Sequence, residues 1–204
     1  MALSSHEQRE VSDMHIWMNE LIDGEAKVLA GALTGRKVLA KLVDLTSNEP
    51  ESPEPVFLDF GGIEVATASF LRESVLAYRD TVRRRRSNLY PVIANANDLV
   101  AEELKVLVAT HGNVLMLCSL DDQGQPHRPR LVGELDPKQR MTFDLVRQRR
   151  ETDAAELMRE HGESERTTVQ TAWNNRLAAL ASLGLVVEMS QGRAKRYRPL
   201  FAED

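Results

Sequence analysis

Hydrophobic and polar positions alternate in two different ways along this chain, and the change falls near residue 136. Between residues 33 and 135, short apolar runs are separated by longer segments with helical periodicity. The pattern predicts strands at residues 56–60, 89–94, 114–119 and, at a sheet edge, 130–133, with helices at 34–45, 70–85 and 99–111. This alternation indicates an α/β fold. Residues 1–32 are predicted to form a separate N-terminal helical segment.

The remainder, residues 136–204, is predicted to be a smaller and mainly α-helical domain. Asp136 followed by Pro137 is a favourable helix start, because aspartate caps free N–H groups and proline suits the first turn. Helices are predicted at residues 137–149, 152–161 and about 167–183, the last ending at Gly184. Two β-prone runs, 185–189 and 193–198, flank a tight turn and predict a hairpin.

The third of these helices has two faces of opposite chemistry. With about 100° per residue, one arc is apolar and is expected to be buried, together with the aliphatic stem of Arg176; it carries Val169, Trp173, Leu177 and Leu180. The opposite arc and its flanks carry short uncharged side chains: Thr167, Thr168, Gln170, Thr171, Asn174 and Asn175. Hydroxyl and amide groups can approach a polyanion and hydrogen-bond base edges, where a carboxylate would be repelled. The same pattern also fits a polar, solvent-facing helix without charge.

Positive charge is concentrated in the predicted hairpin. Four cations lie within six residues of its tip and return strand: Arg193, Lys195, Arg196 and Arg198. The net charge of the whole chain, −5, argues at first against a polyanionic partner. Residues 137–204, however, carry 12 Lys and Arg against 10 Asp and Glu, so the acidity belongs to residues 1–136. Nucleic-acid binding therefore depends on where the cations lie.

The order helix, helix, helix, basic hairpin resembles a bacterial winged helix-turn-helix domain. The resemblance covers roughly 65 residues and rests on Thr171-Ala-Trp-Asn-Asn-Arg-Leu177, followed by Leu180 and Leu183-Gly-Leu185, which is similar to recognition helices of winged-helix regulators. It implies that the polar helix face enters the major groove, through Thr167, Thr168, Gln170, Thr171, Asn174 and Asn175. The hairpin cations Arg193, Lys195, Arg196 and Arg198 would then hold phosphates or the minor groove. A palindromic operator requires two copies of the chain, so a homodimer is expected.

Residues 33–135 resemble a STAS-like domain, the fold of anti-sigma-factor antagonists. The resemblance rests on Gly35-Arg36, on the run Phe57-Leu-Asp-Phe-Gly-Gly-Ile-Glu-Val-Ala-Thr-Ala-Ser-Phe70, and on Asn95-Ala-Asn97. It implies a mixed sheet with helices and a regulatory or protein-binding role. Antagonists of this type are phosphorylated on a serine at the start of the helix, and Ser69 lies nearest that position. This chain has Ala68-Ser69-Phe70 in place of the usual Asp-Ser pattern, and Thr67 or Ser69 also fits a plain helix N-cap.

No catalytic, cofactor or metal site is predicted. Asp59 and Glu64 have no nucleophile or histidine at useful spacing, the five histidines lack metal-ligand spacing, and Cys118 is the one cysteine, in an apolar run. Gly61-Gly62 lacks the layout of a nucleotide-binding loop. The run Arg83–Arg86 is interpreted either as a solvated helix end or as an auxiliary phosphate or partner contact.

The sequence therefore predicts a DNA-binding transcriptional regulator rather than an enzyme. The absence of an apolar run of about 20 residues and of a signal-peptide pattern indicates a cytoplasmic protein with no membrane contact. The alternative is a protein-interaction and signalling module of the anti-sigma-antagonist type. In that case the α/β domain would bind a regulatory protein, under control of phosphorylation at Ser69.

Overall fold

The central element of the fold is a five-stranded mixed sheet. The structure, a computed structural model, describes residues 14–111, 113–191 and 194–201. The sheet has the order β1-β3-β5-β6-β7, with all neighbours parallel except β7, which runs antiparallel to β6 at one edge. Its strands are Met14–Trp17 (β1), Glu54–Asp59 (β3), Leu89–Ala94 (β5), Leu115–Leu120 (β6) and Pro126–Val132 (β7). The predicted α/β class and the edge strand are confirmed.

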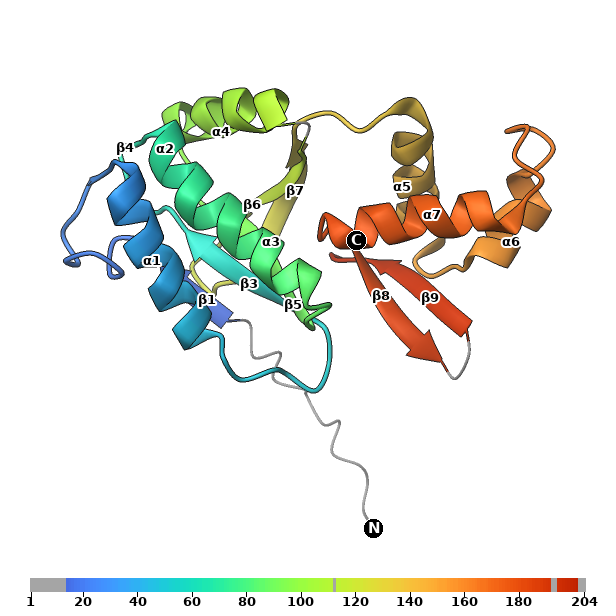
Figure 1. Ribbon diagram of the computed structural model, residues 1–204, viewed down its shortest axis with the longest axis horizontal. Coiled ribbons are helices and arrows are strands. Elements are labelled where there is room, and N and C mark those ends of the chain that lie inside the picture. Colours follow the sequence, from blue (N-terminus) through green and yellow to red (C-terminus); the bar gives the residue numbers. More distant parts are fainter. Residues whose placement is uncertain (1–13, 112, 192–193, 202–204) are drawn as a thin grey trace, which may run out of the picture.

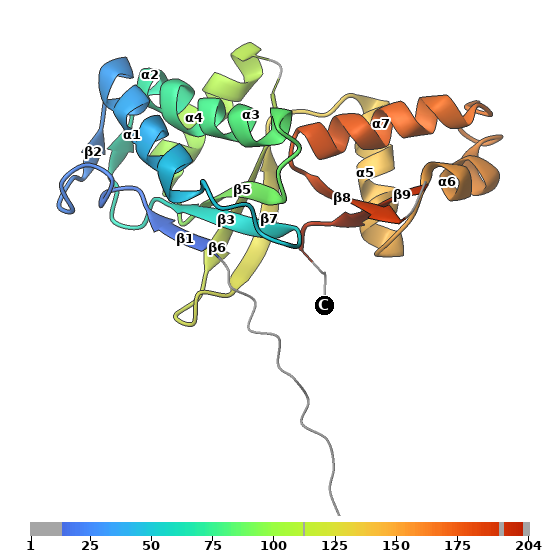
Figure 2. The ribbon, with the colours of Figure 1, turned by 60° about the horizontal axis from the view of Figure 1, so that its bottom comes forward.

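Helices cover one face of this sheet (Figures 1 and 2). They are α1 (Ala32–Leu45), the continuous helix formed by α2 (Ala68–Leu71), a π-helical turn η1 (Arg72–Leu76) and α3 (Ala77–Arg84), and α4 (Asp98–His111). Side chains alternate along β3, so that Val56 and Leu58 join the core beneath the helices and Phe57 points to the opposite face. A Cβ on Gly35 would lie 2.8 Å from the Phe70 carbonyl oxygen, so glycine permits α1 to pack closely on α2.

The prediction of a helical N-terminal segment is wrong for the residues described. Residues 14–17 form strand β1, which pairs in parallel with β3 at the sheet edge, and residues 28–29 form a short strand β2 paired with β4 (Val65–Ala66). Gly24 and Gly31 have φ values of +81° and +85°, which helical backbone excludes. Met18 and Leu21, in the turn that follows β1, extend the core of the sheet.

The part of the chain from residue 137 onwards, called the C-terminal half below, follows the predicted order of three helices and a β-hairpin. The elements are α5 (Pro137–Arg149), α6 (Ala154–His161), α7 (Gln170–Ser182), β8 (Val186–Gln191) and β9 (Ala194–Pro199). The Asp136 side chain accepts hydrogen bonds from the Lys138 and Gln139 amides at 2.9 Å, which confirms the predicted helix start. Thr152, between α5 and α6, forms an antiparallel bridge with Tyr197 and so ties the hairpin to the helices.

One apolar core joins the C-terminal half to the second face of the sheet. It includes Phe57, Tyr90, Val92, Met116, Phe143, Trp173, Leu180, Val186 and Tyr197. Polar contacts cross the same seam, since Arg83 donates from Nε to the Ala181 carbonyl (3.2 Å) and the Glu188 amide donates to the Tyr90 hydroxyl (3.1 Å). Arg83 is therefore buried at the seam, whereas Arg84, Arg85 and Arg86 keep the exposed position expected of a helix end. The two sequence domains meet in a continuous interior.

Candidate nucleic-acid interface

Helix α7, together with Thr168 just before its N-cap, presents a row of uncharged polar side chains to solvent. Thr168, Gln170, Thr171, Asn174 and Asn175 are all exposed. Within the part of the chain that the structure describes, no hydrogen bond is formed by the side-chain hydroxyl or amide groups of these five residues. The neighbouring inner side of α7 is packed against α5 and α6. The outer face therefore has unused donors and acceptors on a rigid helix.

The inner side of α7 explains two predictions that are wrong. Thr167 was expected on the outer face, but it is 8% exposed. Its carbonyl accepts from the Trp173 indole at 2.8 Å and its hydroxyl accepts from Arg176 at 2.9 Å. Val169 was expected in the core, but it precedes the first turn as the N-cap residue and is 61% exposed. A helical wheel assumes helical backbone at both positions, whereas α7 begins only at Gln170.

The hairpin cations are less free than the sequence suggests. Arg196 lies among the three carboxylates of Glu151, Asp153 and Glu156. The hydrogen bond to Glu151, and to a smaller extent the one to Glu156, raises the pKa of this guanidinium. Lys195 is more exposed and pairs with Glu188 at 2.7 Å. Arg198 is half-buried. Arg193 lies outside the described residues.

Two adjoining grooves run along α7. The first, with a volume of about 480 Å³, lies between α7, the start of α6 and β9, and Gln170, Asn174, Asn175 and Lys195 line it. The second, of about 610 Å³, continues past Ala178 and Lys195, which line both grooves. Asp153 in the first groove and Glu188 in the second add negative charge. The structure thus brings three of the predicted α7 residues and one hairpin cation to a single surface.

The second groove adds two cations from the run Arg83–Arg86, which the sequence left open as either a solvated helix end or an auxiliary phosphate or partner contact. Arg84 and Arg86, just after Arg83, line it together with Ser182 of α7. Arg83 places them there, because its buried guanidinium bonds the Ala181 carbonyl. The arginine run was visible in the sequence, but no local signal relates residue 83 to residue 181, which lie 98 positions apart.

Sequence comparisons do not assign this chain to a family. No protein-family model and no curated protein matches the chain. Among the described helices, none has both the length and the apolar character needed to cross a membrane. The described residues also contain no group of three or more His, Cys, Asp or Glu side chains arranged to hold a metal ion.

Two other residues singled out in the sequence, Ser69 and Asp59, form contacts with neighbouring side chains. Thr67 is the N-cap of α2, and Ser69 Oγ lies 3.2 Å from the Thr67 hydroxyl. The Glu103 carboxylate accepts from the Ala68 amide at 2.8 Å, so it would repel a phosphoryl group at this helix start. Asp59 is buried and accepts from Asn95 Nδ2 at 2.9 Å and contacts His15 Nε2 at 2.5 Å. Glu64 pairs with Lys27 instead.

Proposed function

We propose that this protein is a cytoplasmic DNA-binding transcriptional regulator in which α7 reads the major groove. The C-terminal half would be a winged helix-turn-helix domain and the α/β half a STAS-like domain. Support comes from the order of elements from α5 to β9 and from the Thr152–Tyr197 bridge that holds the hairpin against the helices. The operator would be palindromic and the active form a homodimer.

One observation carries the proposal: the outer face of α7 is exposed, uncharged and rich in unused hydrogen-bonding groups. A helix that only faces water is better served by Glu, Lys and Arg, which favour helix and solvation together. Amide side chains such as Asn174 and Asn175 match the donor–acceptor pair that adenine presents in the major groove, and the threonines can contact a base or a phosphate. Burial of Thr167 removes it from the contact set, which becomes Thr168, Gln170, Thr171, Asn174 and Asn175.

Phosphate contacts are assigned to the cations beside this face. Lys195 lines both grooves, and its exposed pair with Glu188 can exchange for a phosphate at small energetic cost, since surface pairs contribute about 0–1 kcal/mol. Arg84 and Arg86 extend the positive surface beyond the hairpin. Arg196 is assigned a structural role, because three carboxylates already surround it.

The test is selection of bound duplexes from a random pool, followed by binding titrations at several salt concentrations. Asn174→Ala should lose about 1–3 kcal/mol on the selected site and relax the preference at one position. Lys195→Gln should weaken binding to all duplexes and reduce the salt slope by about one. Lys37→Gln, an equal charge change on exposed α1, is the matched control. Unchanged binding in both α7 and hairpin variants would refute the proposal.

A protein-docking role is the second candidate, and the neutralised hairpin favours it. With Arg196 held by carboxylates and Lys195 paired to Glu188, part of the predicted basic ribbon is electrostatically satisfied within the protein. The α/β half would then bind a regulatory partner and the hairpin a second protein. Salt separates the two candidates, since DNA affinity falls steeply between low and moderate ionic strength and a packed protein interface is much less sensitive.

A further inference from the structure

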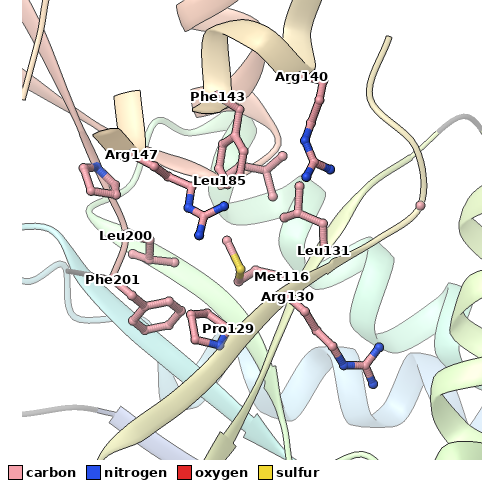
Figure 3. A pocket seen from close by; sticks show the side chains of 12 residues that line it. Met116, Pro129, Arg130, Leu131, Arg140, Phe143, Arg147, Leu185, Leu200 and Phe201 are labelled. Carbon is pink, nitrogen blue, oxygen red and sulfur yellow. The ribbon is translucent and has the colours of Figure 1, made fainter. Parts of the chain in front are cut away.

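Helix α5 carries apolar side chains on two sides of its axis. The inner side holds the buried residues Thr142, Phe143 and Val146. Phe143 points into a cavity of about 340 Å³ at the seam between the two halves, where it lies beside Leu185 (Figure 3). Since each residue turns the helix by about 100°, Met141 projects on the side opposite to this buried arc. Helices that are apolar on both sides normally bury both of them.

The outer side of α5 is uncovered in the part of the chain that the structure describes. An open hollow of about 630 Å³ runs along it, and the described residues that line this hollow all belong to α5 itself. Pro137 and Gln148 are exposed there, and Met141 and Leu145 between them are half-buried. Pro137, Met141 and Leu145 follow one another at intervals of four residues, so they form one stripe. Water therefore meets an apolar stripe on a helix whose other side is core.

Charged groups of both signs stand beside this stripe. Arg140 lines the seam cavity as well as the outer hollow, so it lies on the flank between the two sides of α5. Its Nε is 3.1 Å from Oδ2 of Asp144, and the two side chains are 57% and 49% exposed. A cation and an anion four positions apart complement a second copy of the same helix when the two copies run antiparallel. A purely basic or purely acidic partner would match only one of these two charges.

We propose that the outer side of α5 is the interface of a homodimer, in which the α5 helices of two copies pack antiparallel across a two-fold axis. With the axis level with residue 142, Met141 packs against the stripe of the other copy, and Arg140 lies opposite the other copy's Asp144. The exposed pair within each chain exchanges for two pairs between the chains at small cost, because surface pairs contribute little to stability. This interface supplies the homodimer of the proposed function, and it rests on that function for the expected oligomeric state.

The position of α5 suits the spacing of a palindromic operator. Helix α7 packs against α5. Packed helix axes lie about 8–10 Å apart, so three successive contacts, from one α7 through the two α5 helices to the other α7, span about 24–30 Å. Half-sites one turn apart are separated by about 34–36 Å. The exposed Val28 and Val65 are less suitable, because β2 and β4 lie at the opposite end of the molecule from α7 (Figures 1 and 2).

Analytical ultracentrifugation of the full-length protein without DNA tests the interface. One pair of helices buries less than the about 1,200–2,000 Å² of a standard interface, so the expected dissociation constant is micromolar. Met141→Glu should raise this constant by about tenfold or more, because the two-fold axis places the change at the interface twice. Met141→Leu should leave it within about twofold. Leu99→Glu, at a 67% exposed position on α4, is the matched control and should have no effect.

A mixture of two charge variants separates this arrangement from other dimers. Arg140→Glu leaves two acidic groups on the flank of each copy, and Asp144→Lys leaves two cations. Each variant alone should dimerise about fivefold or more weakly than the wild type, because like charges then face each other. Mixed in equal amounts, the two should form heterodimers more tightly than either forms homodimers, since both cross-pairs are then of opposite sign. Circular dichroism of each variant checks that the fold is retained.

The interface is overturned if the protein is monomeric at about 0.1 mM, or if Met141→Glu dimerises as the wild type does. It is also overturned if Leu99→Glu causes the same loss as Met141→Glu, or if the mixed charge variants associate no more tightly than each alone. These outcomes are distinct from those for DNA binding. A dimer through α5 that binds no duplex would refute the proposed function alone, and a monomer that binds a duplex would refute the interface alone.

Discussion

Arg83 is the residue through which the seam between the two halves is best tested. Its Nη1 donates to the carbonyls of Ser87 (2.7 Å) and Leu89 (3.1 Å), its Nε donates to Ala181, and its guanidinium carbon lies 3.9 Å from the centre of the Tyr90 ring. Arg83→Met keeps most of the aliphatic stem and removes the charged donors. Three buried carbonyl groups then lose this donor, although the Ala181 carbonyl still accepts from the Gly184 amide at 3.0 Å.

The expected loss of stability is large for a single substitution. A hydrogen bond from a charged donor contributes about 1.5–3 kcal/mol, and a desolvated cation–π contact about 2 kcal/mol. These contributions are not additive, because the groups form one network. Breaking a buried charged interaction typically costs about 3–5 kcal/mol, and we expect Arg83→Met to fall in that range. Arg84→Met, the exposed neighbour, should change stability by about 0.5 kcal/mol or less.

Urea unfolding followed by two signals measures this effect. Trp173 is fully buried in the C-terminal half, so its fluorescence reports that half, while far-ultraviolet circular dichroism reports helices of both halves. Trp17 contributes a second indole, and Trp17→Phe removes it. In the wild type the two transitions should coincide, because one core spans the seam. A loss below about 1 kcal/mol for Arg83→Met, or an equal loss for Arg84→Met, would refute the reasoning.

Three further predictions concern the interior. Burial, with a smaller contribution from Asp59, raises the pKa of Cys118 to about 12, so Ellman's reagent should react with it far more slowly in the native protein than in urea; equal rates would contradict this. Burial raises the pKa of Tyr78 to about 12, against a smaller lowering by Thr46, and its oxygen has no well-formed hydrogen bond within the described residues. Tyr78→Phe should therefore be neutral or stabilising by up to about 1 kcal/mol, and should reduce the stability that the wild type loses above about pH 10, where the unfolded tyrosine ionises and the buried one does not. Gly35→Ala should destabilise despite the better helix propensity of alanine, because its Cβ would meet the Phe70 carbonyl; a gain in the urea midpoint would show that α1 can shift.

The local sequence pattern was sufficient to predict those helices and strands whose formation depends on their own residues. The core strands of the sheet follow from apolar runs bounded by turn residues, and α5 follows from Asp136-Pro137 and its helical periodicity. The end of α7 at Gly184, which has a φ of +78°, was equally readable, because only a residue without a side chain adopts that backbone easily.

The sequence-based predictions were wrong where a residue's structure depends on contacts outside its own local segment. Met14–Trp17 is a strand because β3 offers an unpaired edge, and nothing within four residues indicates that edge. Burial of Thr167 depends on Trp173 and Arg176, which turn back onto it. The position of Arg196 depends on carboxylates that are 40 to 45 residues away in the sequence. Charge counted along a strand therefore overestimated the positive surface of the hairpin.

The smaller positive surface of the hairpin changes the salt dependence and specificity expected for DNA binding by this protein. If the hairpin offered four free cations, affinity would be dominated by phosphate contacts and would fall steeply with salt. With Arg196 enclosed by carboxylates and Lys195 paired to Glu188, the electrostatic contribution rests on exchangeable or peripheral groups, chiefly Lys195, Arg84 and Arg86. The acidic groups Asp153 and Glu188 beside the grooves further disfavour non-specific contact with a polyanion.

Under the proposed function, a larger share of the binding energy must then come from base contacts by the amides and hydroxyls of α7. Non-specific duplexes should therefore bind weakly even at low salt. Strong, sequence-independent binding would be inconsistent with this distribution of charge.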